Sequence, residues 1–534
     1  MHLFYVLYIA FFVICANITY TIGRAIFAPT RKIPGPFLAR FTRLWYFRAI
    51  WGGEAEKANY ALHRKYARNG EFFAPIVRVG PNMFSIIEPD KQVYGISSRM
   101  RKSVWYEGWK HPSPDRWTLF PDQDIQRHAE TRKKFQHLYS LSSLKSYEQY
   151  VDDCMEIFQD RLRELASAGN YFDMGHWFQC YAFDVIGAIT YSKRIGFLDS
   201  GRDIHGIIAA LDSNMPYSTL IGIYAWAHPI VYKILEYLPN SGAASRNKLM
   251  KYVQENKSTR EAMRQTWDVE GKGVEAKGED EPEDFLDKML TMRDDHKRGV
   301  TDYHCFIMGL SNIIAGSDTT AVSLSSTLYH LIKTPRAMQK LREEVRSFEQ
   351  EGRLAPNTVS FAVSQEMPYL QACIKEALRL HPAVGLPLWR TVYKGGAKIC
   401  GQYLPAGSDV GINAWVAHYN RDVWGVDVDE FRPERWLDLW NAIDDECAVN
   451  VESLALTKEK LKQMERNFLA FGMGSRTCLG RNVSILEMNK LIPQLFRLYD
   501  FELVNAHAEW KVENYWFAKQ VGLRCSIRPR QRNH

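Results

Sequence analysis

The stretch Phe471-Gly472-Met473-Gly474-Ser475-Arg476-Thr477-Cys478-Leu479-Gly480 surrounds one cysteine with glycines and a permanent cation. A thiolate persists at neutral pH where positive charge and hydrogen-bond donors lie close to the sulfur. Arg476 and the amides of a glycine-rich turn can supply both. An isolated cysteine is more often a small buried apolar residue, which is how we interpret the other cysteines of the chain. The frame around Cys478 therefore predicts a metal-bound thiolate.

The pattern F-x-x-G-x-R-x-C-x-G in this stretch matches the haem-binding signature of the cytochrome P-450 family, which the chain resembles. The resemblance implies that Cys478 is the axial ligand of the iron of haem b, where a thiolate pushes electron density toward bound oxygen. It also implies that Arg476, Gly474 and Gly480 contact the haem, and that Phe471 packs beside the sulfur and limits water there. A hydrolase with Cys478 as nucleophile is a weaker alternative, because the frame contains no recognisable general base.

A run of small and polar residues, Ala315-Gly316-Ser317-Asp318-Thr319-Thr320, lies inside a long helix predicted over 303–333. Gly316 has no Cβ, and a threonine hydroxyl can bond a carbonyl one turn back, so the helix can loosen here and admit oxygen and water. Read alone, the run also fits a helix kink without function. The family pattern crosses the distal face of the haem, which implies that Gly316 adjoins the cofactor and that Asp318 and Thr319 pass protons.

Glu376 and Arg379 are three residues apart, so they project from one face of a predicted helix. Such a pair is usually a surface ion pair that contributes little to stability. The resemblance implies a buried network instead, completed by Arg435 from the segment Phe431-Arg432-Pro433-Glu434-Arg435-Trp436. In that reading the network clamps the loop that leads to the cysteine and takes no part in bond making.

Haem carries two propionates, and the resemblance implies which further cations bind them. Arg390 follows the helix of Glu376 and matches an arginine that reaches a propionate in the family. His128 and Arg132 are four residues apart on one predicted helix, where the family commonly has W-x-x-x-R with both side chains on the propionates. Histidine keeps an N–H donor at the position of the tryptophan; a plain exposed His–Arg pair remains the alternative.

The first 23 residues predict a transmembrane anchor. No charged side chain occurs from Leu3 to Gly23, which meets the roughly 20-residue length that crosses a bilayer core. Basic residues follow directly and favour a cytosolic C-terminal flank. Prolines 34 and 36 forbid a helix, so we predict a basic, proline-rich hinge over residues 24–36. A secretory signal peptide is the alternative, but an odd number of scattered cysteines does not suit an oxidising compartment.

Composition sets the size of the core and the class of partner. The chain has 534 residues, of which 46% are hydrophobic, enough for a large buried core. Its net charge of +7, from 68 basic and 61 acidic side chains, suits an anionic membrane surface or an acidic protein partner. This charge is too small for its length to indicate nucleic-acid binding.

The spacing of apolar residues predicts a mainly α fold with small β-sheets. Predicted helices cover 125–139, 147–168, 177–190, 303–333, 335–348 and 367–380, and predicted strands cover 76–79, 83–87, 397–403 and 409–412. We expect a single large catalytic domain over 37–534 behind the anchor. A second apolar stretch, 219–238, fits either a buried helix pair or a lip of a substrate entrance that dips into the membrane.

The resemblance runs from about 34 to 528 and looks like fungal microsomal members of the pisatin demethylase-like group. It implies a haem-thiolate monooxygenase that inserts one atom of dioxygen into a lipophilic small molecule, in secondary metabolite biosynthesis. It also implies a single-pass protein of the endoplasmic reticulum membrane, with its catalytic domain in the cytosol. The chain has no nucleotide-binding fingerprint, so NADPH would act only through a separate membrane-bound reductase, NADPH-cytochrome P-450 reductase.

Two other functions remain open on the same motifs. A P-450-fold isomerase or dehydratase would work on an oxygenated substrate without a reductase. Relatives of that kind often lose the threonine of the long helix, so the presence of Asp318 and Thr319 argues against this function. The third alternative is a membrane-tethered haem-binding protein without catalysis, although every catalytic letter is intact.

Overall fold

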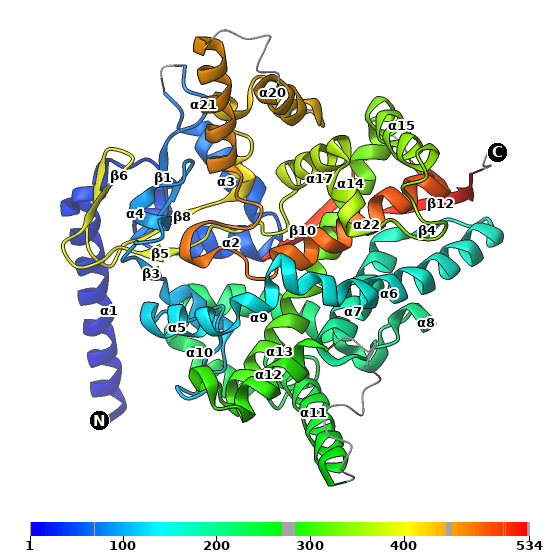
Figure 1. The fold of residues 1–534 in the computed structure, drawn as a ribbon. Coiled ribbons are helices and arrows are strands. Elements are labelled where there is room, and N and C mark those ends of the chain that lie inside the picture. The colour runs from blue at the N-terminus through cyan, green and yellow to red at the C-terminus, as the bar shows by residue number, and fades with distance from the viewer. Residues whose placement is uncertain are drawn as a thin grey trace.

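The computed structural model describes residues 2–68, 70–269, 283–444, 451–505, 507 and 509–530. Helices dominate these residues, and the strands form small sheets beside them (Figure 1). The predicted mainly α fold with small sheets is confirmed. The helices are α1 (His2–Phe27), α2 (Leu44–Trp51), α3 (Ala55–Lys65), α4 (Lys91–Tyr94), α5 (Ile125–Phe135), α6 (Leu141–Ala168), α7 (Met174–Tyr191), α8 (Phe197–Ser200), α9 (Ile207–Ile223), α10 (His228–Leu235), α11 (Gly242–Val269), α12 (Phe285–Asp294), α13 (Asp302–Gly316), α14 (Asp318–Lys333), α15 (Pro335–Gln350), α16 (Phe361–Gln365), α17 (Pro368–Leu380), α18 (Ala414–Ala417), α19 (Arg421–Trp424), α20 (Glu434–Asp444), α21 (Val451–Asn467) and α22 (Arg481–Leu498).

The largest sheet has the strand order β1-β2-β8-β5-β3, and three smaller sheets are β4-β12-β9, β10-β11 and β6-β7. The strands are β1 (Ile76–Gly80), β2 (Met83–Ile86), β3 (Arg101–Lys102), β4 (Phe172–Asp173), β5 (Arg390–Thr391), β6 (Ala397–Ile399), β7 (Gln402–Leu404), β8 (Asp409–Ile412), β9 (Tyr499–Leu503), β10 (Lys511–Tyr515), β11 (Phe517–Val521) and β12 (Arg524–Pro529). The predicted strand over 397–403 is a hairpin, with a turn at Cys400 and Gly401, both at positive φ. Two-residue strands such as β3 and β5 were not predicted, because they are too short to show a period.

The core is built around α7, which is buried on nearly all sides between α6, α13 and α14. An all-round apolar helix is stable only in such a position. Helix α14 also packs against α17 and α22. The helix that carries Glu376 and the helix that follows Cys478 therefore share one neighbour, α14.

The predicted helix over 303–333 is interrupted at Ser317, which separates α13 from α14. Hydroxyl groups bond carbonyls one turn back on both sides of the break: Ser317 Oγ donates to Ile313 O at 3.1 Å, and Thr319 Oγ1 donates to Ala315 O at 2.6 Å. Gly316 lies at the break, and a Cβ there would come within 2.7 Å of Ile186 Cγ1 in α7. The missing side chain thus lets α7 pack closely against α13.

The predicted anchor and the start of the predicted hinge are one helix, α1, which continues to Phe27. Residues 24–27 contain no helix breaker, and the chain leaves the helical conformation at Ala28, directly before Pro29. The helix therefore continues into the first residues of the predicted hinge. In the part of the chain whose side chains the structure describes, no helix combines the length and the apolarity that a membrane crossing requires.

The apolar stretch 219–238 comprises the end of α9, a short turn and α10. Helix α10 buries His228 and Tyr232 but leaves Ile230 and Ile234 about three-fifths exposed, and Trp226 before it is 77% exposed. The interpretation as an ordinary buried helix pair is therefore wrong for α10. Large apolar side chains gathered on one exposed face indicate a contact with something apolar.

Candidate active site

Cys478 lies between a short 3-10 turn (Gly474–Arg476) and the N-terminus of α22. Backbone hydrogen bonds shape the loop before it: Cys478 N–H donates to Phe471 O at 2.8 Å, and Gly472 N–H donates to Leu469 O at 2.9 Å. Gly472 and Gly474 both have φ near +66°, in the left-handed region that favours glycine. The fold of the loop thus favours glycine at both of these positions.

The Cys478 thiol is influenced by opposing effects. Burial is the larger effect and raises its pKa overall, although the backbone N–H groups of Gly480 and Arg481 and the charge of Arg132 act to lower it. The sulfur also lies at the N-terminus of α22, where the helix dipole favours negative charge. Cys478 nevertheless keeps exposed surface, so the sulfur is accessible although protein surrounds it. This environment fits a thiolate that binds a metal.

Gly474 cannot carry a side chain, because a Cβ there would lie 1.8 Å from Tyr94 O. We expect Gly474→Ala to lower haem content and thermal stability far more than Gly522→Ala. Gly522 is also left-handed, at φ +81°, but a Cβ there meets no atom within 4 Å. The control therefore isolates the backbone strain, about 1–2 kcal/mol. Equal melting temperatures and equal haem content for the two variants would contradict the importance of the Tyr94 contact.

The predicted propionate ligands lie together around one cavity of about 210 Å³. Its lining includes His128 and Arg132 from α5, Arg390 from β5 and Arg476 from the cysteine loop. Arg132 Nη1 donates to Thr477 O at 2.7 Å, which ties α5 to the residue before Cys478. Burial, followed by the charges of these arginines and of Lys102, lowers the pKa of His128 to about 2. The histidine is therefore neutral among cations.

Lys102 and Tyr106 belong to the same cluster and were not predicted from the sequence. Lys102 pairs with Arg390 across β3 and β5, and its ammonium lies 4.2 Å from the centroid of the Tyr106 ring. Burial, followed by the charges of Arg390 and Arg476, lowers the pKa of Lys102 well below its ordinary value. Lys102 and Arg390 are 288 positions apart in the sequence, so only the pairing of β3 with β5 shows that Lys102 belongs to this cluster.

This cluster fits a group that brings carboxylates. Arg476 Nη2 and Tyr106 Oη are buried without a hydrogen-bond partner, and buried donors are nearly always paired. The nearby Asp122 forms its ion pair with Arg127, at 2.6 Å. Among the described residues, no carboxylate forms an ion pair with the cations that line the cavity. The propionates of a bound haem would supply the negative charge and the acceptors that these donors lack.

Asp318 and Thr319 form the first turn of α14. Asp318 is fully buried, with its Oδ2 2.9 Å from Lys519 Nζ and its Oδ1 accepting a 2.6 Å hydrogen bond from Gln179 Nε2. Lys519, on β11, also contacts the half-exposed Asp212 of α9. Lys519 and Gln179 could not be recognised as partners of Asp318 from sequence alone, because each comes from a distant element.

Helix α14 is also joined to the cysteine side of the molecule. Thr320 Oγ1 lies 2.8 Å from Ser484 Oγ, in the first turn of α22. The helix break with Asp318 and Thr319 is thus linked to the helix that begins beside Cys478.

A Cβ at Gly480 would meet no heavy atom within 4 Å, and the backbone φ there is −82°. Neither crowding nor φ therefore requires a glycine at this position.

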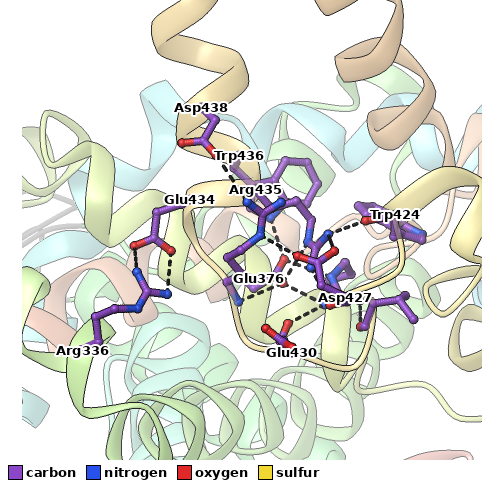
Figure 2. A network of polar contacts seen from close by, with 12 residues as sticks. Arg336, Glu376, Trp424, Asp427, Glu430, Glu434, Arg435, Trp436 and Asp438 are labelled. Atoms are coloured by element: carbon purple, nitrogen blue, oxygen red, sulfur yellow. Dashed lines mark hydrogen bonds and ion pairs between the residues drawn. The ribbon is translucent and has the colours of Figure 1, made fainter.

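The structure brings Glu376, Arg379 and Arg435 together in a buried network. Figure 2 labels Glu376 and Arg435 with several of their neighbours. Arg379 donates to both Glu376 oxygens, at 2.8 and 3.0 Å, and Arg435 Nε donates to Glu376 Oε1 at 3.2 Å. Trp436 Nε1 donates to Glu376 Oε2 at 3.0 Å, and Arg435 also pairs with Asp427 at 2.8 Å. Every charge in this network has an opposite partner, which burial requires.

Comparison with known proteins agrees with this geometry. The cytochrome P-450 family profile matches residues 62–524. Pisatin demethylase of Fusarium vanettenii is 36% identical over 524 residues, which cover 97% of this chain and 92% of the relative. A cytochrome P-450 monooxygenase of Aspergillus terreus is 35% identical over 88% of this chain and 89% of its own length. The monooxygenase gsfF of Penicillium aethiopicum is 31% identical over 93% of both chains. The chain belongs to the cytochrome P-450 family.

Proposed function

We propose that this oxygen-incorporating oxidoreductase inserts one atom of dioxygen into a lipophilic small molecule in fungal secondary metabolism. Its electrons come from NADPH through a separate reductase, NADPH-cytochrome P-450 reductase, since the sequence has no nucleotide-binding fingerprint. The observation that carries the proposal is the position of the Cys478 sulfur, at the N-terminus of α22 and beside a cluster of cations without carboxylate partners. The similarity to fungal monooxygenases supports the secondary-metabolite role.

In this proposal Cys478 holds the haem iron, and Arg132, Arg390 and Arg476 bind the propionates. His128 donates a hydrogen bond as a neutral imidazole, and Lys102 and Tyr106 join the three arginines. When bound, haem supplies one-electron transfer and the activation of oxygen. Gly480 lets the backbone approach the cofactor, and Phe471 limits water beside the sulfur.

In this proposal Asp318 and Thr319 would hold and pass the protons that the reaction consumes, and Gly316 lies beside them at the helix break. The Thr319 hydroxyl donates to Ala315 O at 2.6 Å, so its lone pairs stay free to accept a hydrogen bond from water. Lys519 and Gln179 fix the two oxygens of Asp318. Protons reach this buried carboxylate from the half-exposed Asp212 region, where Lys519 is 27% exposed. The role of these residues is to hold and orient proton donors.

The substrate is expected to be largely apolar and flat, because aromatic rings from distant segments meet beside the cation cluster. The ring centroids of Trp109 and Trp516 are 5.2 Å apart, and the ring centroid of Phe120 lies 5.5 Å from each of them. Trp516, at the tip of the β10–β11 hairpin, has φ +97°, a strained conformation that is typical of ligand-binding positions. Trp109 Nε1 is buried without a partner and can donate a hydrogen bond to an oxygen of the substrate.

We further propose that α1 attaches the catalytic domain, residues 37–534, to the endoplasmic reticulum membrane as a single cytosol-facing anchor. The uncharged sequence from 3 to 23 supports this, and the exposed apolar face around α10 supports a second contact. Deleting residues 2–27 is expected to move much of the protein from the membrane pellet to the supernatant. Adding Trp226→Ser and Ile230→Ser to the deletion is expected to release most of the remainder. If the protein with the deletion and both substitutions stayed fully in the pellet, neither α1 nor the apolar face around α10 would be a membrane contact.

The function is tested by two measurements on purified, haem-loaded protein. The carbon monoxide difference spectrum of the reduced protein is expected to show the band typical of thiolate ligation. Product formation is expected to require NADPH, dioxygen and a reductase, with one labelled oxygen atom from dioxygen in the product. Turnover without reductase would favour the isomerase or dehydratase alternative. A thiolate band without turnover on any ligand that shifts the spectrum would favour a haem-binding protein without catalysis.

A further inference from the structure

His418 lies between the Glu376–Arg379 pair and the loop that leads to Cys478. It follows α18 and is fully buried. Arg379 holds it from two sides: the Arg379 guanidinium donates to His418 O at 3.0 Å, and His418 Nδ1 lies 2.9 Å from Arg379 O. The backbone and the side chain of His418 are therefore both fixed by one residue of the network.

The other ring nitrogen of His418 contacts the cysteine loop. Leu469 N–H donates to His418 Nε2 at 2.7 Å. Leu469 O in turn accepts the N–H of Gly472, and Phe471 O accepts the N–H of Cys478. Hydrogen bonds, together with the peptide bond between Phe471 and Gly472, therefore connect Arg379 through one imidazole to the cysteine.

The two contacts define the state of the ring. Nδ1 must carry the proton to donate to Arg379 O, and Nε2 must be unprotonated to accept from Leu469, so only one neutral tautomer satisfies both. Burial lowers the pKa of His418 to about 3, in agreement with a neutral ring. Phe468 stacks on the imidazole, with the ring centroids 5.6 Å apart and an angle of 7° between the planes. Trp424 packs against the same ring, with the centroids 5.9 Å apart. The ring cannot turn without losing both hydrogen bonds and the stacking.

We propose that His418 is a positioning residue that fixes the start of the cysteine loop at Leu469, and thereby sets the direction of the Cys478 sulfur. Because Arg379 holds His418 in place, the position of the Glu376–Arg379 pair also determines the position of the sulfur. This inference rests on the proposed function, in which that sulfur binds the haem iron. Leu469 is itself buried, so without His418 its N–H would be left without an acceptor, and the loop would move to satisfy it.

The test compares His418→Phe with the unchanged full-length, haem-loaded protein. Phenylalanine keeps the stacking on Phe468 and removes both hydrogen bonds. We expect amide hydrogen exchange in the peptide containing Leu469 to become about tenfold faster or more, because its acceptor is gone. We also expect part of the thiolate band in the carbon monoxide difference spectrum to be lost, together with a shift in the reduction potential.

Two further variants separate positioning from general stability. His418→Gln places an amide oxygen near the former Nε2, so it is expected to restore slow exchange at Leu469 and most of the thiolate band. His63→Phe is the matched control: His63 is also fully buried and bridges Ala74 O and Ser85 Oγ, at 2.7 and 2.9 Å. This control is expected to lower the melting temperature without changing exchange at Leu469 or the spectrum.

The outcomes distinguish this inference from the proposed function. Unchanged exchange and an unchanged spectrum in His418→Phe would overturn the positioning role. Equal changes in His418→Phe and His63→Phe would overturn it as well. If His418→Phe does not fold, failure of folded His418→Gln to keep slow exchange at Leu469 and the thiolate band overturns the role. A missing thiolate band in the unchanged protein would instead refute the proposed function.

Discussion

Replacing Cys478 with serine is expected to lower monooxygenase turnover by about a thousandfold or more and to remove the thiolate band from the carbon monoxide difference spectrum. The hydroxyl of serine stays protonated at neutral pH and is a poor ligand for haem iron. The backbone hydrogen bond from residue 478 to Phe471 O does not depend on the side chain. The loop should therefore keep its shape, so the loss reports on the sulfur itself.

Cys400→Ser provides the control for this experiment. Cys400 is also partly exposed and free of disulfides, but it lies in the turn between β6 and β7, outside the cysteine loop. We expect this variant to retain the band and the turnover. A Cys478→Ser protein with an unaltered thiolate band would show that another group binds the iron, and the proposed function would lose its basis.

The sequence was most informative where all the residues that shape a site lie within one short segment. The loop of Cys478 is such a segment, since positive φ favours glycine at positions 472 and 474, and Tyr94 O leaves no space for a Cβ at position 474. The run around Thr319 likewise predicted a disturbed helix, and the break lies at Ser317. In both cases the physical cause is local, because hydroxyls and glycines act on backbone groups within one turn.

Contacts between distant elements could not be predicted in the same way. Lys102 joins the cation cluster only because β3 pairs with β5, and Lys519 reaches Asp318 only because β11 lies against α14. His418 was missed for the same reason. Neither strand propensity nor helical spacing specifies which residues meet across these separations. The interpretation of 219–238 as a buried helix pair was wrong for α10 for a different reason. Apolarity alone does not distinguish a buried face from an exposed one.

Replacing Glu376 with alanine is expected to have the largest effect on stability. Glu376 is fully buried and accepts hydrogen bonds from Arg379, Arg435 and Trp436. Removing it leaves two buried guanidinium groups facing each other without their shared carboxylate. Breaking a buried ion pair in this way costs about 3–5 kcal/mol, a large part of the roughly 5–15 kcal/mol that stabilises a folded domain. Most of the protein should fail to retain haem at 37 °C.

Glu434→Ala is the matched control, because it lies in the same region and also binds cations (Figure 2). Its partners Arg336 and Lys340 are 54% and 45% exposed, so water can solvate them after the change. The expected loss is about 1 kcal/mol or less. Denaturant unfolding of the haem-loaded proteins measures both values. A loss for Glu376→Ala no larger than that for Glu434→Ala would mean that water or a neighbouring group compensates the buried arginines. The network could not then be the clamp that holds the cysteine loop.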